Sequence, residues 1–234
     1  ATASALPAVD SVSDTVATAG HLSTALDAET TRLLLGTVPA CLHAGVQDLL
    51  LIALALAFSE FTGSRDSPLL IDVESHGRQE DLGAGIDLSR TVGWFTAKSP
   101  VRLDLGTAAW PQVRSGDAPL AALLKKAKEQ LRATPDPLSY GMLRYLNAEV
   151  DLTGPDPSIG FNYLGRPPAA GAEGWRVERW GALFSKSEGT GPAIPLMHAV
   201  EVTAVTVDDG DGPRLQADWM WAPSLLDRAD IVRL

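Results

Sequence analysis

The 234-residue sequence is poor in the residues from which disulfides and metal sites are built. It contains one cysteine, Cys41, which excludes an internal disulfide and leaves no cysteine cluster for a metal. Cys41 lies between Pro39 and Leu42, and we interpret it as a small apolar filler rather than a nucleophile. The four histidines are also isolated from one another: His21, His43, His76 and His198. We therefore expect no metal site, and the cysteine content fits a reducing cytoplasm.

Basic residues are scarce as well. Lys and Arg total 19 against 29 Asp and Glu, which gives a formal net charge of -10 and argues against a nucleic-acid partner.

The longest apolar run, residues 49–58, is too short for a membrane span of about 20 residues and predicts a buried helix instead. Residues 1–20 lack the pattern of a signal peptide and suggest a poorly ordered lead-in. The sequence ends within a predicted helix, so we expect residues 21–234 to be cut from something longer.

Helical and strand patterns alternate along the rest of the chain. Helices are predicted at residues 27–35, 46–61 and 119–132, the second of them apolar nearly all round and hence central. Short apolar runs predict strands at residues 69–73, 94–103, 159–164, 175–180, 199–207 and 215–221. Pro100 marks an interruption or an edge in the second strand, residues 208–212 form a hairpin turn, and residues 167–174 form a flexible loop. This order predicts one α/β domain, a two-layer mixed sheet covered by helices.

Three segments form a specific pattern. The first runs from Glu74-Ser75-His76-Gly77-Arg78 through Arg90-Thr91-Val92-Gly93-Trp94-Phe95-Thr96 to Leu103. The second is Tyr140-Gly141-Met142-Leu143-Arg144-Tyr145, and the third is Phe161-Asn162-Tyr163-Leu164-Gly165. In this order and spacing they resemble the C-terminal motifs of epimerization domains in nonribosomal peptide synthetases. The string from Arg90 to Thr96 is the most specific part.

The resemblance implies a chloramphenicol-acetyltransferase-like half domain. Two such halves form a V with a tunnel between them, and a carrier protein delivers a peptidyl thioester into it on a phosphopantetheine arm. The other half holds a His-His-x-x-x-Asp-Gly motif, which this sequence lacks. The implied partners are therefore that N-terminal half and a peptidyl carrier protein, no cofactor is bound directly, and the chain alone is expected to be inactive.

The resemblance also assigns roles to particular residues. Glu74 becomes one of two acid/base groups that exchange the α-proton of the thioester, with a pKa raised by burial. Arg78 is implied to pair with the aspartate of the absent motif and to join the halves. His76 is more simply a structural hydrogen-bonding residue, and Gly77 permits a tight backbone path beside the tunnel.

Four further residues support the tunnel or the motifs. Trp94 is expected in the core or the tunnel wall, and Tyr140 belongs to the second motif. Asn162 and Tyr163 either bridge the two halves or form a satisfied polar pair in the core. We expect Phe161 and Tyr163 to contribute apolar surface that the other half would cover.

The sequence departs from the family pattern in places, so alternatives stay open. Ser75 stands where the family usually has glycine, Gln79 where it has glutamate, and residues 137–139 replace a glycine-rich stretch. One alternative is an amide-forming condensation domain, and another is a non-catalytic carrier-protein docking module. Lys125, Lys126 and Lys128 are read as a solvated helix face that such a carrier protein could also touch.

Overall fold

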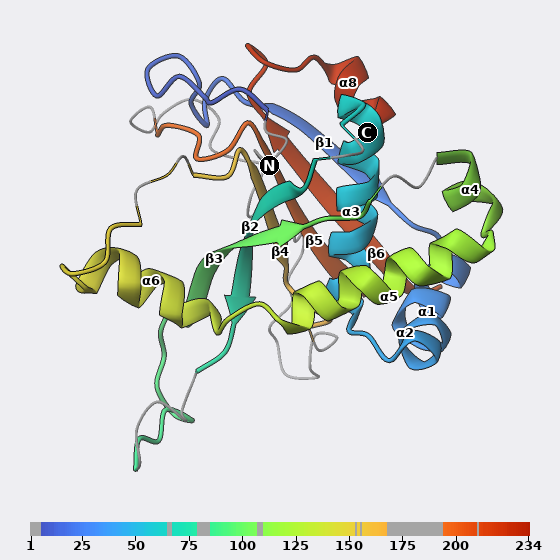
Figure 1. Cartoon of the computed structure of the whole chain (residues 1–234), viewed down its shortest axis with the longest axis horizontal. Coiled ribbons are helices and arrows are strands. Elements are labelled where there is room, and N and C mark those ends of the chain that lie inside the picture. The colour runs from blue at the N-terminus through green and yellow to red at the C-terminus, as the bar shows by residue number, and fades with distance from the viewer. Residues whose placement is uncertain are drawn as a thin grey trace.

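The computed structural model describes residues 6–64, 67–78, 85–106, 110–152, 154, 156–167, 194–209 and 211–234. Its strands are β1 Gly20–Ala25, β2 Leu69–His76, β3 Thr96–Leu103, β4 Ile159–Tyr163, β5 Val200–Asp209 and β6 Gly212–Trp221 (Figure 1). Its helices are α1 Ala28–Leu35, α2 Thr37–Leu42, α3 Val46–Thr62, α4 Trp110–Ser115, α5 Ala118–Arg132, α6 Pro137–Leu146 and α8 Arg228–Arg233.

The six strands form one mixed sheet in the order β1-β6-β5-β4-β2-β3. Strand β4 runs parallel to both of its neighbours, β2 and β5, whereas the other pairs are antiparallel. Because β3 pairs only with β2, it is an edge strand, and Pro100 is accommodated within it without interrupting the pairing. The predicted α/β mixed sheet is thus confirmed.

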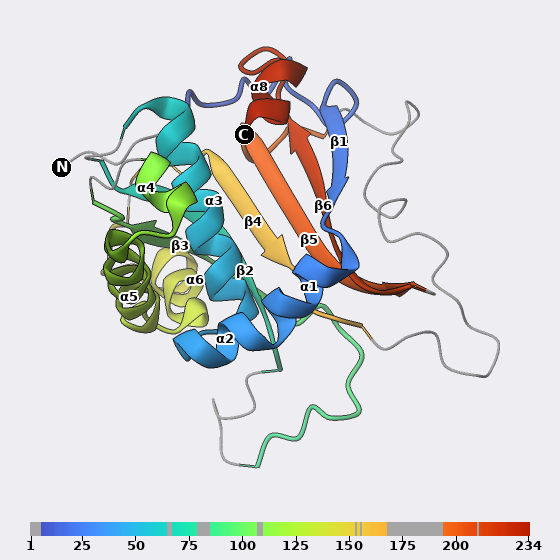
Figure 2. The ribbon, with the colours of Figure 1, turned by 90° about the vertical axis from the view of Figure 1, so that its right-hand side faces the viewer.

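One face of the sheet forms the hydrophobic core. Successive side chains of a strand point to opposite faces, so alternate residues of β2 and β5 meet α3 on this side. Phe58 of α3, Ile71 of β2 and Val200 of β5 are completely buried there. In Figure 2, α3 and α5 lie on the same side of the sheet. The prediction that the apolar helix starting at Val46 is central is therefore confirmed.

The opposite face of the sheet is polar. Asp72, Glu74 and His76 alternate along β2 on this face. In the sheet register Glu74 lies opposite Lys98 of β3 on one side and Asn162 of β4 on the other. Acidic, basic and amide side chains from several strands therefore lie next to one another on the face away from the core.

The sequence predicted most of these elements but not all of them. The strands predicted before and after the hairpin turn form β5 and β6, whose last register pair is Asp209 with Gly212. Strand β1 and helices α2, α4 and α6 were not predicted. The predicted strand at residues 175–180 and most of the predicted loop at 167–174 lie outside the described residues.

The segment before β1 contacts the body of the domain. Thr15 forms an isolated antiparallel bridge with Pro195, and Asp14 is buried and accepts a hydrogen bond of 2.6 Å from the Ser224 hydroxyl. The Leu6 amide donates to the Ser158 hydroxyl at 3.1 Å. The assignment of residues 1–20 as a lead-in and of 21–234 as the domain stays a prediction.

The helices are short compared with what a bilayer requires. Within the described part of the chain, no single helix is long and apolar enough to cross a membrane. The stretches 28–42 and 46–62, bent by 96° where they meet, reach that length and composition only as a pair.

A buried hydroxyl of α1 completes the hydrogen bonding of β6 where β1 has ended. Thr31 is fully buried, and its Oγ1 accepts a hydrogen bond of 3.1 Å from the Leu215 amide. Replacing Thr31 by Val keeps the shape but leaves that amide unsatisfied, so Thr31→Val should destabilise the fold by about 1–3 kcal/mol. Thr31→Ser, which keeps the hydroxyl, is the matched control. Urea unfolding measures both, and a Val variant as stable as the Ser variant would contradict this role.

Candidate functional site

The polar face brings Glu74 into a chain of hydrogen-bonded side chains. Asn162 donates through Nδ2 to Glu74 Oε2 at 2.8 Å, and its Oδ1 lies 2.7 Å from His76 Nε2. The other ring nitrogen of His76 lies 3.2 Å from the Thr96 hydroxyl. Because the Asn162 oxygen must accept from His76, this geometry assigns the Nε2 proton to His76. Asn162 thus holds the Glu74 carboxylate directly, as part of a chain of side chains from β2, β3 and β4.

The surroundings of Glu74 favour its protonated form. Burial raises the pKa of this half-buried carboxyl, and the negative charge of Glu201 raises it further. The positive charges of His76 and Lys98 act in the opposite direction without cancelling these effects. A carboxyl with a raised pKa can hold and release a proton nearer to neutral pH than an exposed glutamate can.

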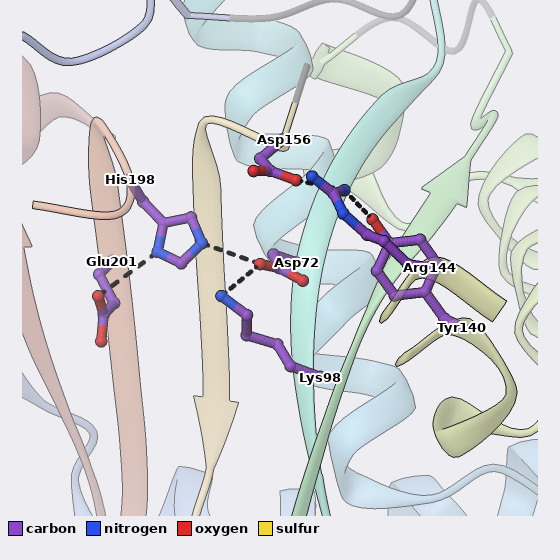
Figure 3. Close-up of polar contacts among 7 residues, drawn as sticks. All are labelled: Asp72, Lys98, Tyr140, Arg144, Asp156, His198 and Glu201. Carbon is purple, nitrogen blue, oxygen red and sulfur yellow. Dashed lines mark hydrogen bonds and ion pairs between the residues drawn. The ribbon is translucent and has the colours of Figure 1, made fainter. Parts of the chain in front are cut away.

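A second group of charged residues lies on the same face, and its member Lys98 is the register partner of Glu74. Figure 3 shows the contacts within this group. Lys98 Nζ lies 2.9 Å from Asp72 Oδ2, and His198 Nε2 lies 3.1 Å from the same oxygen. His198 Nδ1 lies 3.5 Å from Glu201 Oε2. His198 and Asp72 are both buried, so their charges are screened little by solvent.

A glycine makes this arrangement possible. In the sheet register Gly160 of β4 lies between Asp72 of β2 and Glu201 of β5. The His198 ring lies over Gly160 so closely that a Cβ there would come within 2.5 Å of Nδ1. The missing side chain leaves the space in which one imidazole reaches carboxylates on both sides of β4.

The buried pair shifts both of its pKa values toward the charged forms. Burial would raise the pKa of Asp72, but the hydrogen bonds from His198 and Lys98 outweigh it and lower that pKa. Burial would likewise lower the pKa of His198, but its hydrogen bonds with Asp72 and Glu201 raise it above the ordinary value. These contacts therefore favour the charged forms, the aspartate and the imidazolium, over the neutral ones.

The second sequence motif lies in a different cluster. Arg144 of α6 donates to the hydroxyl of Tyr140, one helical turn earlier, and its Nη1 lies 2.6 Å from Asp156 Oδ1 (Figure 3). Helix α6 packs against the edge strand β3. Tyr140 therefore helps to attach α6 to the segment that leads into β4, and no described hydrogen bond or ion pair joins it to Glu74.

Residues 85–95, between β2 and β3, extend away from the body of the domain (Figures 1 and 2). Trp94 is 85% exposed, so of its two expected positions the core is wrong, and a place in the tunnel wall stays a prediction. Arg78 stacks on the Phe95 ring at 5.1 Å and donates to the Thr91 carbonyl at 3.2 Å. Among the described residues Arg78 forms no ion pair, and nothing within 4 Å would crowd a side chain at Gly77.

Tyr163 lies on the opposite face of the sheet from its neighbour Asn162. Its hydroxyl lies 3.1 Å from the Thr206 hydroxyl, and its ring packs against the hydrophobic core. Phe161 is only 4% exposed. The expectation that Phe161 leaves apolar surface open is therefore wrong, because α3 and the neighbouring strands already cover it.

A hollow lies on the helical side, between α2, α3 and α5. Its lining is mainly apolar and includes Cys41, Lys125 and Lys128. Cys41 is exposed, which contradicts its interpretation as a packed filler. Lys128 is directed inward enough to donate to the Leu42 carbonyl at 2.9 Å.

Among the described residues no group of His, Cys, Asp and Glu is arranged to hold a metal ion.

Comparison with known families identifies the fold. Residues 1–180 match the family model for the condensation domain. The chain belongs to the condensation domain family. Among its relatives, chondramide synthase of Chondromyces crocatus is 39% identical over 215 residues, and bacitracin synthase 3 of Bacillus licheniformis is 34% identical over 189 residues. These matches cover 89% and 80% of the chain but only 5% and 3% of the relatives.

Solved structures of the condensation domain family agree with the fold. The epimerization domain from the third module of tyrocidine synthetase B matches with a TM-score of 0.76 and 27% identity over the whole chain. The chain spans 49% of that domain. The first condensation domain of the CDA synthetase matches with a TM-score of 0.52 and 19% identity, covering 91% of the chain and 42% of that structure, which shows a shared fold.

Within this condensation-family fold, the structure unites some of the residues expected from the sequence and separates others. Glu74, His76 and Asn162 form one connected group. The remaining expected residues lie elsewhere: Gly77, Arg78 and Trp94 beyond the strand ends, Tyr140 on α6, and Tyr163 on the core face.

Sequence reasoning missed the charged group beside Glu74, which consists of Asp72, Lys98, His198 and Glu201. One signal was available, because Asp72 interrupts an apolar strand of residues 69–73 and a buried aspartate needs a partner. Nothing local in the sequence pointed to His198, since it lies 126 positions away from Asp72.

Gly160→Ala should disturb the fold through His198. The new Cβ would overlap the imidazole and displace it from both carboxylates, which should cost about 1–3 kcal/mol in unfolding free energy. Gly141→Ala on α6 is the control, because its Cβ meets nothing within 4 Å and alanine favours the helix. Urea unfolding compares the two, and equal stability of both variants would contradict the overlap.

The stabilisation that His198 provides should depend on pH. Asp72, with a lowered pKa, stabilises the fold above its ordinary pKa of 3.8, and this contribution is lost as the pH falls through the folded value. His198, with a raised pKa, stabilises the fold fully below its ordinary pKa of 6.5, and this contribution is lost as the pH rises through the folded value.

The stability difference between the parent and His198→Gln should therefore be largest between pH 3.8 and 6.5 and smaller on both sides. Thermal or urea unfolding across the pH range measures this difference. A difference that does not change with pH would mean that His198 acts only through packing.

Proposed function

We propose that the chain is the part of an epimerization domain that contributes Glu74 as one of two proton-transfer groups. The substrate would be an aminoacyl or peptidyl thioester attached to the phosphopantetheine arm of a carrier protein. The likeness to the tyrocidine synthetase epimerization domain along the whole chain, at 27% identity, is the observation that supports this function best. The half of that domain that the chain does not span would supply the second group.

The proposed reaction needs only proton transfers. A base takes the α-proton, and the C–H electron pair moves into the thioester to form an enolate. A proton is then returned to the opposite face of the α-carbon, which inverts its configuration. No oxidant, metal or other co-reactant is consumed, and each of the two groups must lie within hydrogen-bond reach of the α-carbon on its own side.

The environment of Glu74 suits one of these positions. Asn162 holds one carboxylate oxygen at 2.8 Å, which restricts the orientation of the side chain. Burial and the charge of Glu201 raise its pKa, so that both protonation states are accessible closer to neutral pH. His76 is better placed to orient Asn162 than to act on the substrate, because its two ring nitrogens contact Asn162 and Thr96.

Glu74→Gln in the complete domain tests the proposal. The amide is nearly isosteric but transfers no proton, so exchange of the α-proton of a carrier-bound thioester in deuterated buffer should fall by roughly 100-fold or more. Glu149→Gln removes an exposed carboxylate and should keep the parent rate.

Two outcomes would overturn the proposal. Glu74→Gln that exchanges at the parent rate would exclude the acid/base role and favour the amide-forming condensation or docking function. Exchange by the 234-residue chain alone, clearly above a control without protein, would mean that the second group is not in the other half.

A further inference from the structure

The imidazole of His198 lies between two carboxylates from different strands. Its Nε2 is 3.1 Å from Asp72 and its Nδ1 is 3.5 Å from Glu201, while the ring itself covers Gly160 (Figure 3). The residue is only 7% exposed. A buried ring that faces an acceptor at each nitrogen is a specific arrangement, because a neutral histidine pairs through one nitrogen with an acceptor and through the other with a donor.

The two acceptors around the His198 ring favour its positively charged form. A neutral imidazole carries one N–H and can donate to only one of the two carboxylates, whereas the imidazolium carries two and can donate to both. With Lys98 also 2.9 Å from Asp72, the charged form gives each carboxylate a cationic partner. The geometry therefore calls for an imidazolium at position 198.

This group lies next to Glu74 in the sheet, because Asp72 is two residues earlier on the same face of β2 and Lys98 of β3 is the register partner of Glu74. The charged groups that act on Glu74 are Glu201 of β5, Lys98 of β3, and His76 and Asp72 of its own strand. Those that act on His198 are Asp72, Glu201 and Lys98. Within the group linked by these contacts and charges, the acidic side chains are Asp72, Glu74 and Glu201, and the basic ones are Lys98, His76 and His198.

We propose that His198 is a positioning residue for Glu74. As an imidazolium held between Asp72 and Glu201, it compensates the carboxylates beside Glu74 and so sets the pH range in which Glu74 exchanges its proton. This inference rests on the proposed function, because it gives Glu74 the acid/base role. It adds a regulating charge from a residue that does not touch the substrate.

Variants of His198 and Glu201 should shift the pH dependence of the α-proton exchange rate in opposite directions. The part of this pH–rate profile in which the rate changes as Glu74 titrates is called the Glu74 limb. His198→Gln removes a cation, strengthens the repulsion between Glu201 and Glu74, and should move the Glu74 limb of the profile up by roughly one pH unit. Glu201→Gln removes an anion and should move it down. The double variant His198→Gln/Glu201→Gln removes one charge of each sign and should return the limb close to that of the parent.

These directions do not depend on which role Glu74 plays. Whether Glu74 acts as the base, with a rate that rises with pH, or as the acid, with a rate that falls, the limb follows the pKa of its carboxyl. A purely structural role of His198 would lower stability and rate but would not move the limb. The rescue by the double variant separates the two explanations, because a packing defect at His198 would persist in it.

The experiment measures α-proton exchange of a carrier-bound aminoacyl thioester against pH in the complete domain. It compares the parent, the three variants, Glu74→Gln and the control Glu129→Gln, which removes an exposed carboxylate of α5. The inference expects the control to leave the limb in place and the His198 and Glu201 variants to shift it in opposite directions. In addition, the ring-nitrogen NMR shifts of His198 should show an imidazolium at about pH 6, below the ordinary pKa of a histidine.

The outcomes distinguish this inference from the proposed function. If Glu74→Gln exchanges at the parent rate, the proposed function fails and the inference fails with it. If Glu74→Gln is inactive but the limb stays fixed in the other variants, or the ring of His198 is neutral at about pH 6, below the ordinary pKa of a histidine, only the inference is overturned. Opposite shifts with rescue in the double variant support both.

Discussion

The arrangement of the polar face depends on one imidazole, that of His198, which lies across strand β4 and contacts a carboxylate on each side of it. Gly160 lacks a side chain, so His198 can lie over β4 and reach Asp72 on one side and Glu201 on the other. Without that space the buried Asp72 would keep only Lys98 as a cationic partner. The strand order makes the contact possible, because β4 lies between β2 and β5 and runs parallel to both.

The two faces of the sheet have different roles. Its core face is apolar and packs against α3, so the positions of β2, β4 and β5 are fixed by burial. Its other face can then present charged groups at set distances, including Glu74, which Asn162 holds in a partly dehydrated position. Placing a carboxylate on a strand inside the sheet rather than on a loop gives it a defined orientation, which the proposed proton transfer at carbon would require. Relatives and solved structures agree with this architecture, and the chain spans about half of the solved epimerization domain.

The fold followed from the sequence where a segment's own pattern decided its structure. The apolar run of α3, the short strands β2 and β4, and the hairpin of β5 and β6 were predicted because burial imposes their periodicity. Strand β1, with its mixed polar sequence, was not predicted, because its pairing with β6 is a tertiary contact. The motifs identified Glu74 and Asn162, and register then brought them together. The group of Asp72, Lys98, His198 and Glu201 was missed because its members are far apart in sequence. The core alternative for Trp94 was wrong because hydrophobicity alone does not tell a core residue from an exposed one.

The central claim is that the fold gives Glu74 a raised carboxyl pKa, and a direct titration tests it. Side-chain carboxyl NMR of isotope-labelled glutamate, with the Glu74 signal assigned by its loss in Glu74→Gln, gives the midpoint for this one group. Burial and the charge of Glu201 predict a midpoint clearly above the ordinary value of 4.5. A midpoint at or below that value would mean that solvent or the neighbouring cations dominate at Glu74, and it would contradict the account.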